Sequence, residues 1–225
     1  MYDHIRRNVR RLLAEIPPGV TIVAAAKTRN VGEILAAMET GVSIIGENYV
    51  QEAAKAKTWL DTNNSVPFDA VFHFIGHLQP NKIKRAVELF DLIETVDSIS
   101  LAKELDEQAR RMNTVMPVLI EVNIASEPQK YGVLPDKLLD LALHLDSLPN
   151  LKLQGLMTMG PRLDESGLRP YFMETKRLLE NLKTAKLPNA DLRYLSMGMS
   201  NSYRTAIEEG ANLIRLGTAI FGERS

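Results

Sequence analysis

The sequence predicts a (β/α)8 barrel, and three observations lead to this fold class. Apolar runs of strand length alternate with stretches of helical periodicity about eight times along the 225 residues, which suits one domain spanning 1–225. The run VTIVAAAKT at 20–28 has nothing polar between Thr21 and Lys27, as expected of a strand buried on both faces of a parallel sheet. The glycine-rich turn that follows the first strand of a doubly wound open sheet is absent.

The elements of the first half follow from local signals. Ile5, Val9 and Leu12 recur at helical spacing, which predicts an extra N-terminal helix that the Pro-Pro-Gly stretch at 17–19 ends. Asn30 with Glu33 predicts a capping box for the helix after the first strand. Strands are expected at 42–45 and 70–75, with a helix at 49–60 and a polar connector at 63–67 between them.

The second half keeps the same alternation. Pro80 opens a helix that reaches Leu89, and Ser98 is the expected N-cap of the helix with an apolar stripe at Leu101 and Leu105. The remaining strands are expected at 92–96, 117–123, 152–157, 192–195 and 212–216, and the remaining helices at 98–112, 135–148, 169–182 and 201–209.

Composition excludes several classes of protein. Lys and Arg total 27 against 28 Asp and Glu, so the net charge of -1 predicts neither a nucleic-acid partner nor a membrane-surface partner. The KIKR cluster at 82–85 is interpreted as a solvated helix face. There is no cysteine, which excludes disulfides and thiol catalysis and fits a reducing compartment. We find no signal peptide and no long apolar segment, and therefore expect a cytoplasmic globular protein without a metal site.

Lys27 is the first candidate for chemistry. It ends an apolar strand, where poor hydration of the ammonium form leaves more free amine, and free amine attacks carbonyl groups. This makes Lys27 a candidate for a Schiff base. The alternative is a lysine whose long side chain simply extends to water.

Other polar residues follow the ends of the predicted strands. The carboxyl ends of barrel strands meet at one face, so these residues are expected near Lys27. The loops after the last two strands, SMGMSNS at 196–202 and LGTAIFG at 216–222, predict a phosphate site with backbone N–H groups freed by glycine. The predicted residues at this rim are Lys27, Asn48, His73, Glu94, Asn123, Met157, Ser196, Gly198, Ser200, Arg215, Gly217 and Thr218.

Each of these residues has a structural alternative. Asn48 could be a helix N-cap, and His73 a core histidine with its hydrogen bonds satisfied. Arg215 could form an ion pair with Glu47 or Glu94. Strand alternation predicts that Glu121 points away from its neighbours and is structural.

Seven strings in order along the chain resemble the pyridoxal phosphate homeostasis family, single-domain relatives of the alanine racemase barrel. They run from residue 25 to residue 222 and read AAAKT, GENYVQE, HFIGHLQPNK, EVNIASEPQKYG, GLMTMGP, LSMGMSNSYRTAIEEG and IRLGTAIFG. The resemblance implies an alanine racemase N-terminal-like barrel that binds pyridoxal 5′-phosphate (PLP) as an internal aldimine on Lys27.

The resemblance also assigns the other cofactor contacts. It implies a phosphate held at Ser200, Gly217 and Thr218, and Arg215 facing the pyridine nitrogen. Asn48 and His73 fall on motif positions that line the ring, and Ser196 and Met199 complete the predicted set. Three positions depart from the family pattern: Ser202 replaces an aspartate, Ala26 a serine and Asn30 a proline.

The expected function is PLP homeostasis without catalysis. An arginine at the ring nitrogen leaves the ring a weak electron sink, and the second domain of alanine racemase, with its tyrosine, is not expected here. We therefore expect a monomeric carrier that stores PLP or delivers it to apo-enzymes. Two alternatives remain. One is a PLP-dependent amino-acid racemase or lyase that uses Tyr49, Tyr131 or His77, and the other is a Schiff-base aldolase that acts on a sugar phosphate.

Overall fold

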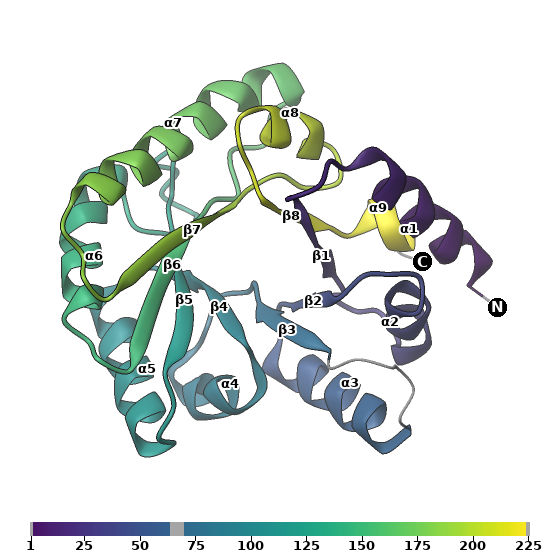
Figure 1. Ribbon diagram of the computed structural model, residues 1–225, viewed down its shortest axis with the longest axis horizontal. Helices are drawn as coiled ribbons and strands as arrows, with labels where there is room; N and C mark the ends of the chain where they lie inside the picture. The colour runs from purple at the N-terminus through teal and green to yellow at the C-terminus, as the bar shows by residue number, and fades with distance from the viewer. Residues whose placement is uncertain (1, 64–69, 224–225) are drawn as a thin grey trace.

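Parallel strands close into a barrel in the computed structural model, which describes residues 2–63 and 70–223 (Figure 1). Each strand pairs with the next one along the chain, and β8 pairs with β1. The predicted (β/α)8 architecture is therefore confirmed. The strands are β1 (Thr21–Ala25), β2 (Ile44–Glu47), β3 (Val71–Phe74), β4 (Leu92–Val96), β5 (Met116–Glu121), β6 (Leu151–Met157), β7 (Ala190–Ser196) and β8 (Leu213–Leu216).

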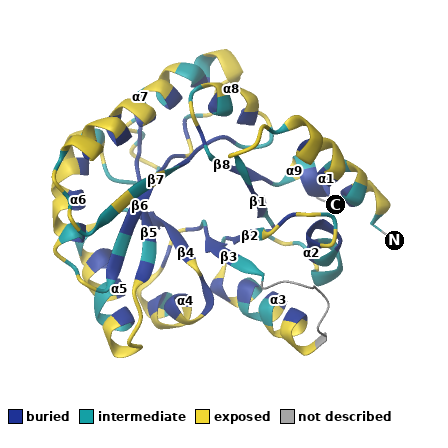
Figure 2. Ribbon diagram, viewed as in Figure 1, coloured by how far each residue is buried: buried dark blue, intermediate teal, exposed yellow. Residues whose placement is uncertain are grey.

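Helices surround the barrel, with their buried residues toward the strands and their exposed residues outward (Figure 2). The helix before β1 is the expected extra one, and Nδ2 of Asn8 in it donates a hydrogen bond to Ile220 O at 3.0 Å. The helices are α1 (Asp3–Glu15), α2 (Val31–Met38), α3 (Val50–Asn63), α4 (Ile83–Leu89), α5 (Ile99–Arg111), α6 (Leu138–Asp146), α7 (Glu165–Thr184), α8 (Tyr203–Glu208) and α9 (Thr218–Phe221), with short 3-10 turns at Pro80–Lys82 and Pro135–Lys137.

Two predicted helix starts are confirmed by their hydrogen bonds. The Asn30 side chain accepts the Glu33 N–H, and the Glu33 carboxylate accepts the Asn30 N–H, which is the reciprocal pattern of a capping box. The Ser98 hydroxyl accepts the Leu101 N–H at the start of α5. These local signals work because both partners lie within one turn of each other.

Several boundaries differ from the prediction. β1 ends at Ala25, because Thr28 turns the chain with a φ of +65°. β7 begins earlier than expected, at Ala190, because its exposed residues interrupt the apolar pattern that marks a buried strand. The four-residue helix α9 was not predicted, since it is too short to show periodicity. Of the predicted connector at 63–67, residues 64–67 lie outside the described residues.

An apolar layer fills the middle of the barrel. Each strand, or the residue directly after it, contributes one side chain, as expected for the layered interior of this fold. The members of this layer are Val23, Ile44, Ile75, Leu92, Leu119, Met157, Tyr194 and Leu213. Because successive side chains on a strand alternate faces, the residues two positions further along also point into the barrel, nearer its carboxyl end.

Gly155 in β6 is expected to tolerate no side chain. Its φ is +149°, and an added Cβ would lie 1.9 Å from the carbonyl oxygen of Tyr194 on β7. We expect Gly155→Ala to lower the free energy of unfolding by more than about 3 kcal/mol, because the two strands must move apart. Urea denaturation followed by circular dichroism measures this loss.

Gly19→Ala is the matched control. Gly19 also has a positive φ, +92°, but an added Cβ there meets nothing within 4 Å. We expect a loss of about 1–2 kcal/mol from the backbone conformation alone. Equal losses in the two variants would contradict the importance of the contact between β6 and β7.

Candidate functional site

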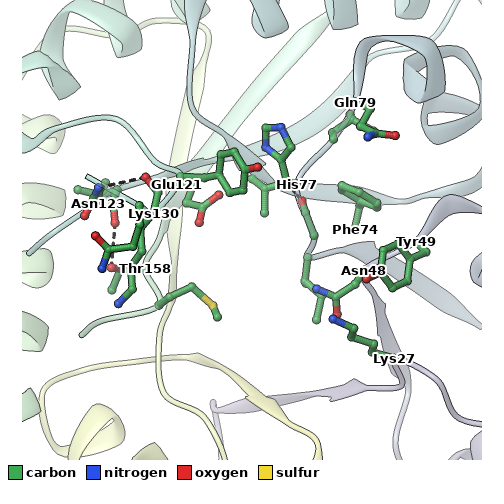
Figure 3. A pocket seen from close by; sticks show the side chains of 18 of the residues that line it. Lys27, Asn48, Tyr49, Phe74, His77, Gln79, Glu121, Asn123, Lys130 and Thr158 are labelled. Carbon is green, nitrogen blue, oxygen red and sulfur yellow. Dashed lines mark hydrogen bonds between the residues drawn. The ribbon is translucent and has the colours of Figure 1, made fainter. Parts of the chain in front are cut away.

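A cavity of about 480 Å³ opens at the carboxyl end of the strands. Its size lies in the range of small-molecule sites. Lys27 and Asn48 lie on one side of it, and Glu121, Asn123 and Lys130 on the other (Figure 3). Of the predicted site residues, Lys27, Asn48 and Asn123 line this cavity. Its lining does not include His73, Ser196, Met199, Ser200, Arg215, Gly217 or Thr218.

Lys27 lies just beyond β1 and lines this cavity. The Ala26 N–H donates to Gly46 O at 2.9 Å, so sheet pairing continues up to the lysine. The side-chain Nζ lies 5.2 Å from the centroid of the Tyr49 ring, and the residue is half-buried. Within the part of the chain that the structure describes, no carboxylate forms an ion pair with this amine. The structure thus favours a lysine that faces the cavity over one that only extends to water.

A buried polar network lies next to the apolar layer, on the side nearer the carboxyl ends of the strands. Glu94, Ser196 and Arg215 each follow a residue of that layer by two positions. Arg215 Nη1 donates to Ser196 Oγ at 2.5 Å, and Ser196 Oγ donates to Glu94 Oε2 at 2.5 Å. Arg215 Nη2 donates to Thr158 O at 2.7 Å, and His73 Nδ1 lies 2.7 Å from Glu94 Oε1. The guanidinium is therefore fixed on two sides.

Glu94 is the counter-ion of Arg215 within this network. Burial disfavours its charge, but the hydrogen bond from His73 and the charges of His73 and Arg215 hold the pKa of Glu94 below its ordinary value. Burial lowers the pKa of Arg215, while the charges of Glu94 and Glu121 oppose that effect. A guanidinium nonetheless stays charged in proteins, so the pair is ionic.

These contacts decide two alternatives left open by the sequence. Arg215 Nη1 lies 3.8 Å from Glu94 Oε2, so Glu94, rather than Glu47, is its ion-pair partner. His73 is 4% exposed and has its hydrogen bond to Glu94, as expected of a satisfied core histidine. Direct contact of His73 or Ser196 with a cofactor remains a prediction.

The predicted phosphate site at Ser200, Gly217 and Thr218, called the phosphate cup below, is built around Ser200. Its Oγ accepts the N–H groups of Gly217 at 3.2 Å and Ala219 at 3.1 Å. Thr218 is exposed at the start of α9. A Cβ added at Gly217 would stay 3.5 Å or more from every neighbouring protein atom, so no contact within the protein requires glycine there. The packing around Gly217 would therefore accommodate a small side chain.

The loop after β7 has a different reason for its glycine. Gly198 has a φ of +95°, and an added Cβ would lie 2.6 Å from the Cβ of Ala206, so packing against α8 requires it. Met199, half-buried in the same loop, donates its N–H to Ser202 Oγ at 3.1 Å. Ser202, one of the departures from the family pattern, thus supplies an acceptor just before α8.

Asn48 lines the cavity rather than capping α3. The N–H groups of Glu52 and Ala53 bond to the Tyr49 carbonyl, which places the first helical bond one residue later. The Asn48 carbonyl lies so close to Gly76 that a Cβ there would approach it to 2.3 Å. The N-cap alternative for Asn48 is therefore not what the structure shows.

The expectation that Glu121 points away from the site is wrong. Glu121 lines the cavity, because it follows Leu119 of the apolar layer by two positions and so points into the barrel. That spacing becomes informative only once Leu119 is known to face the interior, which the apolar run of β5 does not show. Burial and, to a lesser extent, the charge of Asp97 raise the pKa of Glu121 to about 7, against the opposing charge of Arg215.

The loop at 126–132 is tied down by Asn123. Its Nδ2 donates to Glu127 O at 2.8 Å and Lys130 O at 3.3 Å, and its Oδ1 accepts the Glu127 N–H at 3.0 Å. Tyr131 at the end of this loop stacks on His77, with 3.6 Å between ring centroids. Both residues line the cavity, so the stacked rings connect the loops after β3 and β5 beside it.

Residues 2–63 and 70–223 contain neither a candidate metal site nor a membrane-spanning helix. No three His, Cys, Asp or Glu side chains lie together where they could hold a metal ion. None of the helices in these ranges combines the length and apolar character needed to cross a membrane.

Comparisons with solved structures first identify the fold. The structure of PipY from Synechococcus elongatus with PLP bound matches with a TM-score of 0.88 at 32% identity, covering 97% of this chain and 100% of that one. An alanine racemase of Clostridium difficile matches with a TM-score of 0.80 at 14% identity, covering 99% of this chain and 60% of that one. At that identity the racemase shows a shared barrel only.

Sequence comparisons identify the family. Residues 1–225 match the family described as "Alanine racemase, N-terminal domain". A pyridoxal phosphate homeostasis protein of Pasteurella multocida is 40% identical, over 91% of this chain and 87% of that protein. One of Aquifex aeolicus is 40% identical over 90% and 86%, and one of Escherichia coli 34% identical over 92% and 87%. The chain therefore belongs to the pyridoxal phosphate homeostasis proteins, within the alanine racemase N-terminal domain family.

Proposed function

We propose that this protein binds PLP and acts in its homeostasis, by storing the cofactor and releasing it to other proteins. One observation carries the proposal. The Lys27 amine and the cup at Ser200 and Gly217 follow the neighbouring strands β1 and β8, whose pairing sets Ala24 beside Leu216. An amine for the aldehyde and N–H donors for the phosphate thus lie at the same side of the barrel. The names of the relatives and the PLP-bound PipY structure support it.

The residues present fit the cofactor. The N–H groups of Gly217 and Ala219 donate to Ser200 Oγ in this structure, and they are donors of the kind that suits a phosphate that would replace this hydroxyl. Lys27 has no competing carboxylate among the described residues. Arg215 is buried, and its Nη1 and Nη2 donate to Ser196 and Thr158, so the guanidinium is held in place near the end of β8.

Each residue then has a defined task. When bound, PLP supplies an aldehyde that passes reversibly between amines. Lys27 would hold that group through a Schiff base, and Ser200, Gly217 and Thr218 would anchor the phosphate. Arg215 keeps its own protons, so it would leave the ring nitrogen unprotonated and the ring a weak electron sink.

A carrier fits this arrangement better than an enzyme. The weak electron sink disfavours proton abstraction, whereas exchange between amines needs only Lys27 and room for an incoming amine. The cavity beside Lys27 supplies that room, and Tyr49 and Tyr131 at its lining are exposed. The proposal includes a monomer of one domain over 1–225, with apo-enzymes as recipients of the cofactor.

A PLP-dependent racemase or lyase is the second candidate function. The observation in its favour is a pair of acid-base groups on the cavity: Tyr49, close to the Lys27 amine, and Glu121, whose pKa of about 7 suits proton transfer near neutral pH. Incubation of the PLP-loaded protein with individual amino acids decides between the two. Turnover faster than with free PLP, lost in Glu121→Gln or Tyr49→Phe, would favour the enzyme.

Lys27 is expected to carry the cofactor. Protein mixed with PLP should gain a visible absorption band, and borohydride should then fix the label on the peptide that contains Lys27, as read by mass spectrometry. Lys27→Ala should show neither the band nor the label. Lys130→Ala, which removes another lysine of the cavity, is the control and should keep both. A colourless wild type, or a labelled Lys27→Ala, would contradict the proposal.

We expect the Glu94 carboxylate to be the counter-ion that offsets the cost of burying Arg215. Glu94→Gln removes the counter-ion, and we expect the free energy of unfolding to fall by about 3–5 kcal/mol because an unpaired charge stays buried. Urea denaturation without PLP measures this loss, and a titration with PLP should show weaker binding.

Glu15→Gln is the comparison for this variant. Glu15 accepts hydrogen bonds from Tyr203 and Arg204 in a partly exposed position. Its loss should cost about 1 kcal/mol or less, as for surface ion pairs. Similar costs in both variants would argue that Glu94 is not charged in the folded protein.

A further inference from the structure

We propose that Glu47 and Glu52 form a hydrogen-bonded pair of carboxyl groups that shares one proton and holds the turn after Lys27, so that Glu47 is a positioning residue for the Lys27 amine. This inference rests on the proposed function for what Lys27 does. Neither carboxyl group lines the cavity, so the pair acts through the backbone rather than by touching a cofactor.

Glu47 points away from the barrel interior at the end of β2. The preceding residue, Gly46, faces the interior, where an added Cβ would meet Val23 and Ile75. Alternation along the strand then turns Glu47 outward, toward the first turn of α3, where Glu52 lies. The Glu47 side chain is nevertheless 1% exposed.

The environment of Glu47 indicates a proton on its carboxyl group. Its Oε2 is buried and has no hydrogen-bond partner among the described residues, which is costly for an ionised oxygen. After burial, the charge and side-chain hydrogen bond of the neighbouring Glu52 are the main causes that raise the pKa of Glu47. Two adjoining carboxylates cannot both be charged at low cost, whereas one protonated group can donate to the other. A proton on Glu47 would let its carboxyl group donate to Glu52, and it would also remove one of two adjoining negative charges.

Glu52 connects this pair to the lysine. Its Oε2 accepts the N–H of Thr28, the residue after Lys27, at 3.1 Å. Thr28 has a φ of +65°, a left-handed conformation that is unfavourable for a β-branched residue and needs support from its surroundings. The Arg29 N–H completes the turn by donating to Ala26 O at 2.8 Å. The direction in which Lys27 leaves the strand thus depends on the Glu52 carboxylate.

The pair has a defined charge state near neutral pH. Burial, together with the charge and hydrogen bond of Glu52, raises the pKa of Glu47 to about 8, against the lowering effect of a hydrogen bond from the Asn48 backbone. The other charged groups of this turn have separate contacts: Lys27 lies over the Tyr49 ring, and Arg29 pairs with Glu33. Glu52 is therefore the group whose charge bears on Glu47.

Protonated Glu47 stabilises the folded protein at low pH and less at high pH. The folded pKa of about 8 lies above the ordinary value of 4.5, so the folded state holds the proton more tightly than the unfolded state. The stability contributed by the protonated form is complete below pH 4.5 and is lost as the pH rises through about 8. Above that value the two carboxylates repel each other and the support of Thr28 weakens.

The experiment compares capture of PLP by the wild type, Glu47→Gln and Glu47→Ala. Stopped-flow absorbance gives the rate at which Lys27 captures PLP between about pH 6 and about pH 10. Gln is isosteric and still donates to Glu52, but it does not titrate. Affinity for pyridoxine 5′-phosphate, which lacks the aldehyde, separates the lysine from the phosphate cup.

We expect Glu47→Gln to match the wild type at neutral pH and to lack the fall in rate that the wild type shows near pH 8. Glu47→Ala should capture PLP about tenfold more slowly, while its affinity for pyridoxine 5′-phosphate changes less than about twofold. Glu52→Ala should behave like Glu47→Ala, and the double variant should be no slower than either, because both substitutions break the same connection.

Two results would overturn the inference: a rate for Glu47→Ala equal to that of the wild type, or a wild-type pH profile that Glu47→Gln leaves unchanged. Failure of the proposed function looks different, since the wild type itself then captures no PLP on Lys27. In that case thermal unfolding tests the carboxyl pair without reference to PLP. The stability of Glu47→Gln relative to the wild type must increase from pH 4.5 to about 8, and a constant difference rejects the shared proton.

Discussion

The interior of this barrel depends on the ion pair between Glu94 and Arg215. A guanidinium that is 3% exposed needs a counter-ion, and Glu94 is the carboxylate that reaches it, directly and through Ser196. His73 also bonds to Glu94, and the Thr158 carbonyl accepts a hydrogen bond from Arg215. These hydrogen bonds help to offset the cost of burying two charges, and the result is a fixed cation near the end of β8.

Three glutamates at strand ends show how environment decides charge. Glu94 receives hydrogen bonds from His73 and Ser196 and stays ionised. Glu121 and Glu47 are also buried, but no His or Ser side chain among the described residues donates to them, and burial together with neighbouring acidic groups raises their pKa values to about 7 and about 8. The same side chain therefore serves as a counter-ion, as a near-neutral group on the cavity and as a proton-bearing support behind the lysine.

Much of the fold and part of the site could be predicted from the sequence. The alternation of strands and helices, the capping box at Asn30 and the N-cap at Ser98 are local patterns, and they were right. Lys27 and Asn48 line the cavity as expected for residues that follow strands of a barrel. Glu121 was placed wrongly because its face depends on which residues of β5 point inward, and an unbroken apolar run does not show this.

The sequence by itself determined the architecture and the family, because strand periodicity and ordered motifs are properties of neighbouring residues. Only the tertiary structure decided the partners: that Arg215 pairs with Glu94 rather than Glu47, that Ser200 binds the Gly217 N–H, and that Glu52 supports the turn after Lys27. These partners are far apart along the chain, and closure of the barrel brings them together. The physical reason is that hydrogen bonds and ion pairs act over a few ångströms in space, whatever the separation in sequence.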